Sequence, residues 1–257
     1  MWIQVSIVVR SPAHQWALVG VFSAFQVITT IVPYSISVGV EGTISVGLVS
    51  APLIGVLLGP VLGAIAVVIG SVLGIMINSS AGIMWYFTPI ATASGAFVAG
   101  AIRTGRSTLV APVFLAGLIA FLLGPVGYLC LSYVWLHCIT LLPVAALAIP
   151  SVGGRVKLYL EQVSDRVRLT SAVALLSFVA VMTDHIVGSA IAAFYFVYMV
   201  GFDAAGMAAA FNSVSLLYPL ERIVATIILT VVTVALFTAA RSSVLLIDEG
   251  GELARAE

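Results

Sequence analysis

Long runs of apolar residues alternate with short polar or Gly/Pro-containing breaks along the whole chain. A helix that crosses the ~30 Å hydrocarbon core of a bilayer needs about 20 mostly apolar residues. Eight segments approach that length, and we predict a helix in each: 14–36, 43–58, 60–79, 83–102, 107–124, 127–149, 170–199 and 217–240. Gly59-Pro60 and Gly124-Pro125 are each either a helix boundary or a kink within a longer helix. The pattern therefore predicts six to eight transmembrane helices.

Composition strengthens this prediction. Of the 257 residues, 62% are hydrophobic and 8% are charged, and the mean hydropathy is +1.23. Such a chain has too little polar surface to cover a soluble globule, so lipid is the expected solvent. Ten basic and ten acidic residues cancel, and no basic patch indicates a nucleic-acid partner. We predict an all-α, polytopic integral membrane helical bundle, with residues 1–240 as a single transmembrane domain.

The distribution of the basic residues predicts the orientation, because Lys and Arg concentrate in short cytoplasmic loops. If eight spans start from the cytoplasm, nine of the ten basic residues fall on that side and only Arg222 lies within a span. The nine are Arg10, Arg103, Arg106, Arg155, Lys157, Arg166, Arg168, Arg241 and Arg255. Glu41 and Asp203 fall on the outer side. Removing two adjacent spans preserves this agreement, so six spans also fit. We predict a multi-pass cell-membrane protein with both termini cytoplasmic.

The longest polar connection, 150–168, is predicted to be an amphipathic helix on the cytoplasmic membrane surface. Its apolar residues at helical spacing are Val156, Tyr159, Leu160, Val163 and Val167. It acts either as an interfacial linker or as a docking site for a partner. Residues 241–257 are predicted to form a polar cytoplasmic tail. The apolar start ends at Arg10 without a small-residue cleavage site, so we expect no removable signal peptide.

Two patterns of small residues are typical of close helix packing in lipid. In the segment SAPLIGVLLGPVLGAIAVVIGSVLG, glycines recur every four residues, at Gly55, Gly59 and Gly63 and again at Gly70 and Gly74. This segment either packs helices tightly or forms a hinge that shapes a ligand cavity. In the first predicted span, the small residues are Ala17, Gly20 and Ala24. They contact either another helix of this chain or a partner subunit.

Ionisable residues within spans are costly unless paired or wet, and they point to function. Asp184 and His185 lie near the middle of the seventh predicted span and form either a ligand or ion contact or a structural clamp. Arg222 opposes the general charge bias and is a candidate partner for Asp184 or for an anionic ligand. If Pro219 is the first helical residue, Glu221 falls in the first turn, where the helix dipole favours a carboxylate.

Aromatic residues gather near the predicted outer face. Trp85 and Tyr86 follow an outer loop, and further aromatic residues end the seventh span on the same side, at Tyr195, Phe196 and Tyr198. They form either an interfacial belt or a stacking wall for a flat ligand.

The His137-Cys138 pair lacks the three or four ligands that zinc requires, so we predict no metal site and no cofactor. We expect His137 to be buried and bonded to a backbone carbonyl. Cys130 and Cys138 lie eight residues apart, which is roughly 12 Å along a helix and beyond disulfide reach. The sequence also shows no Walker A, HExxH, GxSxG or Rossmann glycine pattern. We therefore predict that the chain is not an enzyme and does not hydrolyse ATP.

Three segments carry a resemblance to a known family: PLIGVLLGPVLGAIAVVIGSVLG, TDHIVGS and YPLERIVATII. With them, the order of the spans from about 14 to 240 resembles the substrate-binding (S) component of an energy-coupling factor transporter. The resemblance implies a helical bundle that binds a vitamin or similar micronutrient at the outer face. A membrane coupling subunit and two cytoplasmic ATPases would drive uptake. Family members usually have six spans, which would make 107–149 an addition.

The resemblance also implies roles for particular residues. Small residues of the first helix contact the coupling subunit in that family, and by position Ala17, Gly20 and Ala24 would do so here. The predicted substrate-binding residues are Asp184, His185, Glu221, Arg222, Trp85 and Tyr86. One alternative is a self-sufficient secondary carrier or channel that uses Asp184 and His185 as an ion or proton relay, although no internal repeat supports it. A membrane-embedded enzyme is another, but it lacks a recognisable nucleophile-base or metal set.

Overall fold

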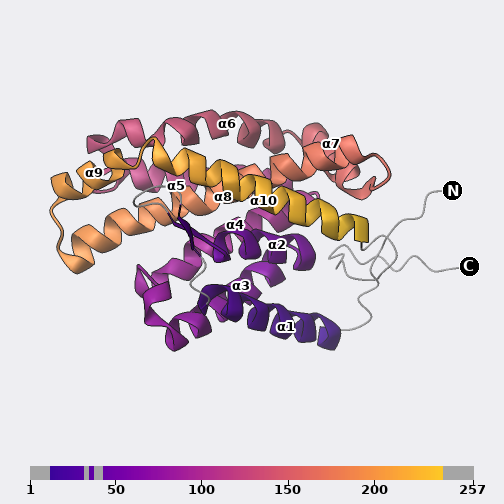
Figure 1. The fold of residues 1–257 in the computed structure, drawn as a ribbon. Coiled ribbons are helices and arrows are strands. Elements are labelled where there is room, and N and C mark those ends of the chain that lie inside the picture. The colour runs from indigo at the N-terminus through magenta and orange to yellow at the C-terminus, as the bar shows by residue number, and fades with distance from the viewer. Residues whose placement is uncertain (1–11, 32–34, 38–42, 240–257) are drawn as a thin grey trace, which may run out of the picture.

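The structure, a computed structural model, describes residues 12–31, 35–37 and 43–239, and these ranges are mostly helical (Figure 1). The helices are α1 (Pro12–Ile31), α2 (Gly47–Leu58), α3 (Pro60–Ile77), α4 (Thr88–Arg103), α5 (Val110–Leu123), α6 (Trp135–Ala148), α7 (Pro150–Glu161), α8 (Arg166–Phe194), α9 (Ala204–Ser213) and α10 (Leu217–Ala239). The short elements are strands β1 (Ser35–Ser37) and β2 (Thr43–Ser45), 3₁₀ turns η1 (Ser79–Ala81), η2 (Trp85–Phe87), η3 (Ser107–Leu109), η4 (Gly127–Leu129) and η5 (Leu131–Val134), and the π-helical turn η6 (Tyr195–Val200). The predicted tail 241–257, Arg10 and Glu41 lie outside the described residues.

Four helical stretches in the described ranges are long and apolar enough to cross a membrane. They are Pro60–Ile77, Leu131–Ala148, Arg166–Val200 and Leu217–Ala239. Gly47–Leu58 and Ser107–Leu123 are apolar but shorter. The helical fold and its long apolar helices therefore agree with the prediction of a membrane protein.

Each of the eight predicted segments contains a helix, but several begin later than predicted. Residues 43–45 form β2, antiparallel to β1 with Ile36 opposite Ile44. Helix α4 begins at Thr88 because the residues before it form η2, where Trp85 has a positive φ of 50°. Helix α6 begins at Trp135, after η4 and η5. The hydropathy pattern does not separate such irregular turns from the helices that follow, because their residues are equally apolar.

Gly59 and Gly124 both end helices, so the kink alternative is wrong. Gly59 has a φ of 82° and is the only residue between α2 and α3. A Cβ on Gly63 would lie 2.7 Å from the Gly55 Cα, which places the two helices side by side after a sharp reversal. A Cβ on Gly55 would overlap the Ala96 carbonyl of α4. These glycines therefore permit close backbone packing among α2, α3 and α4.

A neutral network of buried polar side chains joins α1, α2 and α3. Gln26 is 1% exposed, and its Nε2 donates to the Ser71 Oγ at 3.1 Å. Its Oε1 accepts from the Ser50 Oγ at 2.9 Å, and the Ser50 and Thr29 hydroxyls lie 2.9 Å apart. We call Gln26, Thr29, Ser50 and Ser71 the Gln26 network. It supplies the polar atoms of Gln26 with partners inside the protein, as lipid requires.

The opposite face of α1 carries the predicted small-residue stripe. Ala17, Gly20 and Ala24 are all exposed, and a Cβ on Gly20 would meet no atom within 4 Å. The alternative that this stripe packs within the chain is therefore wrong for the described residues.

Helix α8 lies at the centre of the larger hydrophobic core, which α4 to α10 build, while α1 to α4 form a smaller one. Helix α7 closes one end, where the Ser107 Oγ donates to the Leu147 carbonyl at 2.7 Å. It buries Val156 and Leu160, so residues 150–161 form a helix with one apolar face against the protein, while its position on the membrane surface stays a prediction. Val167 is instead 77% exposed and belongs to α8. Figure 1 shows α7 at the same end as the start of α1 and the end of α10.

Candidate functional site

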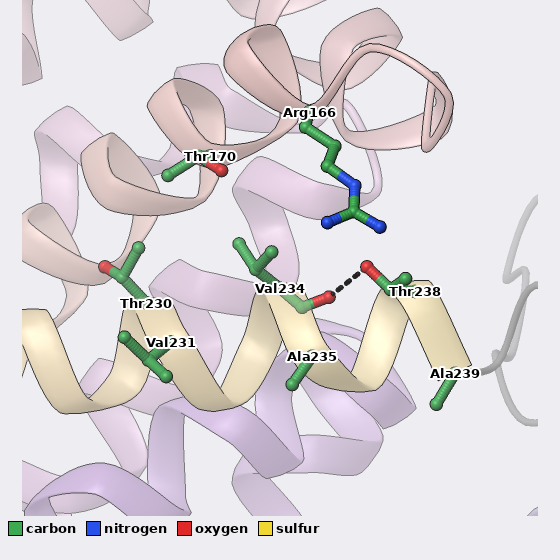
Figure 2. A pocket seen from close by; sticks show the side chains of 8 residues that line it. All are labelled: Arg166, Thr170, Thr230, Val231, Val234, Ala235, Thr238 and Ala239. Atoms are coloured by element: carbon green, nitrogen blue, oxygen red, sulfur yellow. Dashed lines mark hydrogen bonds between the residues drawn. The ribbon is translucent and has the colours of Figure 1, made fainter.

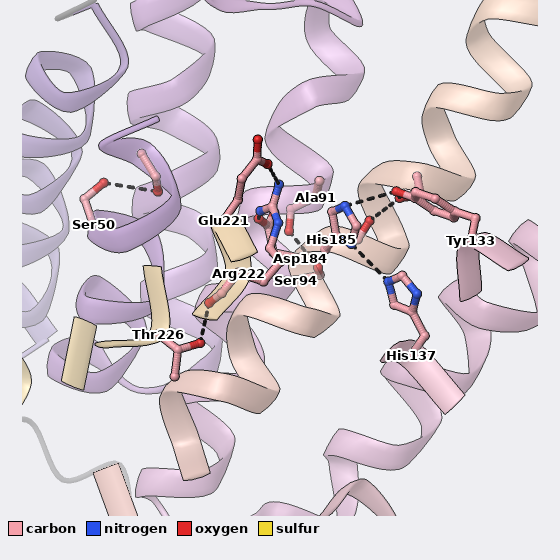
Figure 3. Close-up of polar contacts among 12 residues, drawn as sticks. Ser50, Ala91, Ser94, Tyr133, His137, Asp184, His185, Glu221, Arg222 and Thr226 are labelled. Carbon is pink, nitrogen blue, oxygen red and sulfur yellow. Dashed lines mark hydrogen bonds and ion pairs between the residues drawn. The ribbon is translucent and has the colours of Figure 1, made fainter. Parts of the chain in front are cut away.

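Three ionisable residues from α8 and α10 meet in the interior. The Arg222 Nη1 lies 4.0 Å from the Asp184 Oδ2, and its Nη2 lies 3.8 Å from the Glu221 Oε2 (Figure 3). Asp184 and Glu221 are each 8% exposed. Of the two partners considered for Arg222, the structure places Asp184 beside it, and an anionic ligand stays a prediction. We call Asp184, Glu221 and Arg222 the Arg222 cluster.

Local folding explains how this cluster forms. Helix α10 begins at Leu217 rather than at Pro219, so Glu221 is past the first turn and the helix-dipole explanation for it is wrong. Glu221 faces inward because it shares a buried stripe with Tyr218 and Ala225. On the side of α4, a Cβ on Gly95 would lie 3.1 Å from the Asp184 Cβ, so the glycine leaves room for the carboxylate.

The bonding of the Arg222 cluster is incomplete. Both nitrogen-to-oxygen distances exceed the 2.7–3.2 Å typical of an N–H···O hydrogen bond. The Arg222 Nε is buried and has no hydrogen-bond partner among the described residues. A guanidinium has five N–H donors in a planar fork, so Arg222 retains capacity for a further acceptor. The arrangement is suited to a carboxylate, phosphate or similar anionic group.

A second chain of polar contacts begins beside the cluster, at His185. The His185 Nδ1 lies 3.0 Å from the His137 Nε2, and the His185 Nε2 lies 3.0 Å from the Tyr133 Oη. The Tyr133 Oη also lies 2.8 Å from the Ser189 Oγ. The chain thus joins α6, α8 and η5 through four side chains (Figure 3). We call Tyr133, His137, His185 and Ser189 the His185 relay.

The relay accommodates two opposite donor patterns. In one, the His137 Nε2–H donates to the His185 Nδ1, and the His185 Nε2–H donates to the Tyr133 Oη. In the other, the Tyr133 hydroxyl donates to the His185 Nε2, and the His185 Nδ1–H donates to the His137 Nε2. Each pattern uses neutral imidazoles with one N–H apiece. Because the heavy atoms need not move, the chain has the geometry of a proton pathway.

Aromatic stacking holds the relay in place. The rings of His185, His137 and Tyr218 form a compact group, with centroid distances of 4.5 Å for His185–Tyr218, 5.1 Å for His137–His185 and 5.4 Å for His137–Tyr218. The Tyr218 hydroxyl donates to the Tyr133 carbonyl at 2.8 Å. The expectation that His137 bonds a backbone carbonyl is wrong, because its short contact is to the His185 ring. Both His185 nitrogens have protein partners, whereas Arg222 is under-bonded, so the two predicted site residues differ in their availability to a ligand.

The connection between α8 and α10 covers the Tyr133 end of the relay. In α9, the Phe211 ring lies 4.8 Å from the Tyr133 ring and 5.2 Å from the Phe121 ring. The Ser132 Oγ donates to the Asn212 Oδ1 at 2.6 Å, and the Trp135 Nε1 donates to the Ser215 carbonyl at 3.0 Å. The segment between the last two predicted spans therefore contains a helix that covers the relay.

The predicted outer aromatics lie apart from the Arg222 cluster. Trp85 and Tyr86 are 51% and 49% exposed, and their rings lie 5.2 Å apart. No described ring contact, hydrogen bond or ion pair joins them to the cluster. Phe87 does meet Tyr195, at 6.1 Å, which confirms that the two aromatic groups share one side of the molecule.

Two surface cavities are lined by residues outside the Arg222 cluster. One of about 580 Å³ lies between α8 and α10, and one of about 420 Å³ is lined by residues of 201–210. Among the described residues, no group of three or more His, Cys, Asp or Glu side chains is placed to hold a metal ion, and Cys130 and Cys138 are free thiols.

Sequence reasoning missed Tyr133, Tyr218 and the relay role of His137. The available signal was the presence of phenol and imidazole groups within apolar segments, where each needs a partner. Comparison of the chain with family models, curated proteins and solved structures gives no match.

Proposed function

We propose that this chain is the membrane-embedded substrate-binding subunit of an energy-coupling-factor-type importer. In this proposal, it spans the cell membrane six to eight times with both termini cytoplasmic. It captures a vitamin or similar micronutrient from the outer face, and partner subunits supply ATP-driven uptake. The family resemblance of three sequence segments motivates the importer class, and the under-bonded Arg222 cluster supports a solute site within it.

The single observation that carries the proposal is the largely buried Arg222 side chain, 15% exposed, with weak internal partners. Its two carboxylates lie at 4.0 and 3.8 Å, and its Nε has no partner among the described residues. A structural clamp gains most when every polar group is satisfied, because the low dielectric penalises a missing bond. A binding site must instead exchange its internal ion pairs for contacts to the ligand. Weak internal partners make that exchange easier. We therefore assign Arg222 to an anionic group of the solute, with Asp184 and Glu221 as its companions.

The proposed membrane orientation rests on which ends of the helices carry basic residues. Lys157 of α7 contacts Gly105 in the turn after α4, and Arg166 begins α8 close to Thr238 near the end of α10. These basic segments therefore share one end of the bundle, which we place in the cytoplasm. At that end, the small-residue stripe of α1 and the helix α7 are the proposed contacts for the coupling subunit and the ATPases.

The proposal is tested by purifying the tagged protein in mild detergent from its own host. Mass spectrometry then identifies co-purifying proteins and any retained small molecule. We expect an ATPase pair with a membrane coupling subunit, or a bound vitamin-like compound. A protein that is recovered alone and empty would contradict the importer proposal.

A matched pair of variants localises the solute. Arg222→Lys keeps the positive charge but removes the planar fork, so we expect at least tenfold less retained solute with little change in thermal stability. Arg168→Gln serves as the control, because Arg168 pairs with Asp165 at the surface, 3.1 Å away. Equal retention by both variants would exclude Arg222 from the site.

A second candidate is a self-sufficient proton-coupled carrier, which the two donor patterns of the His185 relay favour. In proteoliposomes, a carrier would acidify or alkalise the lumen when its solute is added. Tyr133→Phe removes the central hydroxyl and should abolish that proton movement while solute binding remains. Under the importer proposal, the purified subunit moves no protons, and Asp184→Ala removes solute retention.

A further inference from the structure

The larger surface cavity, of about 580 Å³, is a groove between the first turns of α8 and the last turns of α10 (Figure 2). Its α10 wall runs from Thr230 to Ala239 and exposes the side chains of Val231 and Ala235. The hydroxyls on this wall are turned to their own helix, since Thr230 donates to the Thr226 carbonyl at 2.6 Å and Thr238 to the Val234 carbonyl at 2.7 Å. The wall is therefore apolar in character.

The mouth of the groove is cationic. Figure 2 shows the Arg166 side chain reaching from α8 towards α10, with its guanidinium over the groove. No hydrogen bond or ion pair to Arg166 occurs within the described part of the chain. Its neighbour Arg168 is engaged, by Asp165 at 3.1 Å and by the Tyr159 ring at 5.5 Å. One turn further along α8, Thr170 is exposed and also lines the groove.

The length of the groove fits one leaflet. Nine steps along α10 from Thr230 to Ala239 correspond to about 14 Å of helix rise. Half of a ~30 Å hydrocarbon core is about 15 Å. The apolar wall thus matches one leaflet in length, and Figure 2 shows the Arg166 guanidinium near Thr238, towards one end of that wall. Basic pockets between transmembrane helices recognise anionic headgroups by this combination.

We propose that this groove binds an anionic phospholipid. Arg166 and Thr170 contact the phosphate, and an acyl chain lies along Val231, Val234 and Ala235. In the orientation proposed above, the lipid belongs to the cytoplasmic leaflet. The site is separate from the Arg222 cluster and does not depend on which solute that cluster binds.

The test uses the full-length protein in neutral detergent, with lipid binding followed by native mass spectrometry. Phosphatidylglycerol and phosphatidylcholine of equal chain length are the probes. We expect phosphatidylglycerol to bind at least fivefold more tightly, and Arg166→Gln to remove that preference. A fivefold change corresponds to about 1 kcal/mol, which is the contribution expected from one basic residue near an anionic headgroup.

Two control variants separate charge from shape. Arg168→Gln should leave the preference for phosphatidylglycerol intact, because Asp165 already neutralises Arg168. Ala235→Trp fills the groove and should weaken both lipids alike. Equal binding of the two lipids by the native protein, or an unchanged preference in Arg166→Gln, would overturn the proposal.

Other occupants give distinct results. If inorganic phosphate at millimolar concentration displaces phosphatidylglycerol completely, the site is one for a free anion and the lipid proposal fails. If phosphatidylglycerol binds only to a variant that ends at Ala239, residues 240–257 occupy the groove instead. Solute retention is measured in the same preparations, so failure of the lipid site is distinguished from failure of the importer proposal.

Discussion

The Gln26 network and the Arg222 cluster solve the same problem in different ways. Both place polar side chains among apolar helices, where each unsatisfied group is costly. In the Gln26 network, neutral groups bond at 2.9 to 3.1 Å across α1, α2 and α3. In the Arg222 cluster, full charges approach only to 3.8 and 4.0 Å, and one guanidinium nitrogen has no described partner.

This difference teaches where to look for function. A neutral and well-bonded network fixes the positions of its helices and has little to offer a ligand. A charged and under-bonded cluster costs stability, and it retains donors for a solute. A polar side chain within a membrane helix is therefore a weak sign of a binding site. A polar side chain with unsatisfied hydrogen-bonding groups is a stronger one.

The largest effect is expected from breaking the Arg222 cluster at its centre. Arg222→Met leaves two buried carboxylates without a cation, and we expect a loss of about 3–5 kcal/mol in the free energy of unfolding. Unfolding in detergent, induced by heat or by denaturant, measures this change. The triple variant Asp184→Asn, Glu221→Gln, Arg222→Met should recover most of the loss and still retain no solute. A stable Arg222→Met protein would show that the three charges are not coupled.

Breaking the Gln26 network is expected to lower stability by less and to leave solute binding unchanged. Gln26→Leu removes bonds to Ser50 and Ser71 and should cost about 1–3 kcal/mol. Solute retention, assayed on the folded fraction, should be unchanged. Gln15→Leu, on the same helix but outside the network, should change stability by less than about 0.5 kcal/mol. Loss of solute binding in Gln26→Leu would remove the distinction drawn between the two regions.

The expected effect of breaking the His185 relay is smaller than either of these. Tyr133→Phe removes one hydroxyl that contacts His185 and Ser189, and it should cost about 1 kcal/mol. Tyr128→Phe is the matched control, because Tyr128 is 65% exposed. Comparing the thermal midpoints of the two variants with that of the native protein measures the difference. Equal midpoints for the two variants would mean that the hydrogen bonds of the Tyr133 hydroxyl contribute nothing to stability.

The smallest effect on folding is expected on the exposed face of α1, opposite the Gln26 network. A Cβ on Gly20 would meet no atom within 4 Å, so we expect Gly20→Leu to leave the isolated protein no less stable. Recovery of co-purifying membrane proteins should nevertheless fall if this face docks a partner. Gly70→Ala, which overlaps Gln26, should instead cost about 1–3 kcal/mol. Unchanged recovery with Gly20→Leu would exclude the stripe as a contact.

Hydropathy correctly predicted a helix in each of the eight apolar segments. It could do so because lipid imposes a minimum length and an apolar composition on a membrane span. The charges within the predicted spans also gave Asp184 as one of two candidate partners for Arg222, since a charge in a membrane span needs an opposite charge. The short helix α9 was missed because its ten residues are too few for a membrane span.

The His185 relay was missed for a different reason. Tyr133 and His185 lie 52 positions apart, and His137 and His185 lie 48 apart. Hydropathy and residue spacing describe neighbours on one helix, and they contain no information on which helices face each other. Gln26 was overlooked although it is a polar residue in an otherwise apolar span, which is a signal that the sequence does contain.

The brevity of α2 has a consequence for how the protein enters the membrane. Its 12 residues rise only about 18 Å, well short of a ~30 Å hydrocarbon core, and 10 of them are buried by neighbouring helices. Such a segment is a poor candidate for independent insertion as the chain is synthesised. It needs α3, to which Gly59 joins it directly, and α4, whose Ala96 contacts Gly55. We therefore expect α1 to α4 to enter the membrane as one unit during synthesis. Helix α2 would reach its final depth only after α4 has been synthesised.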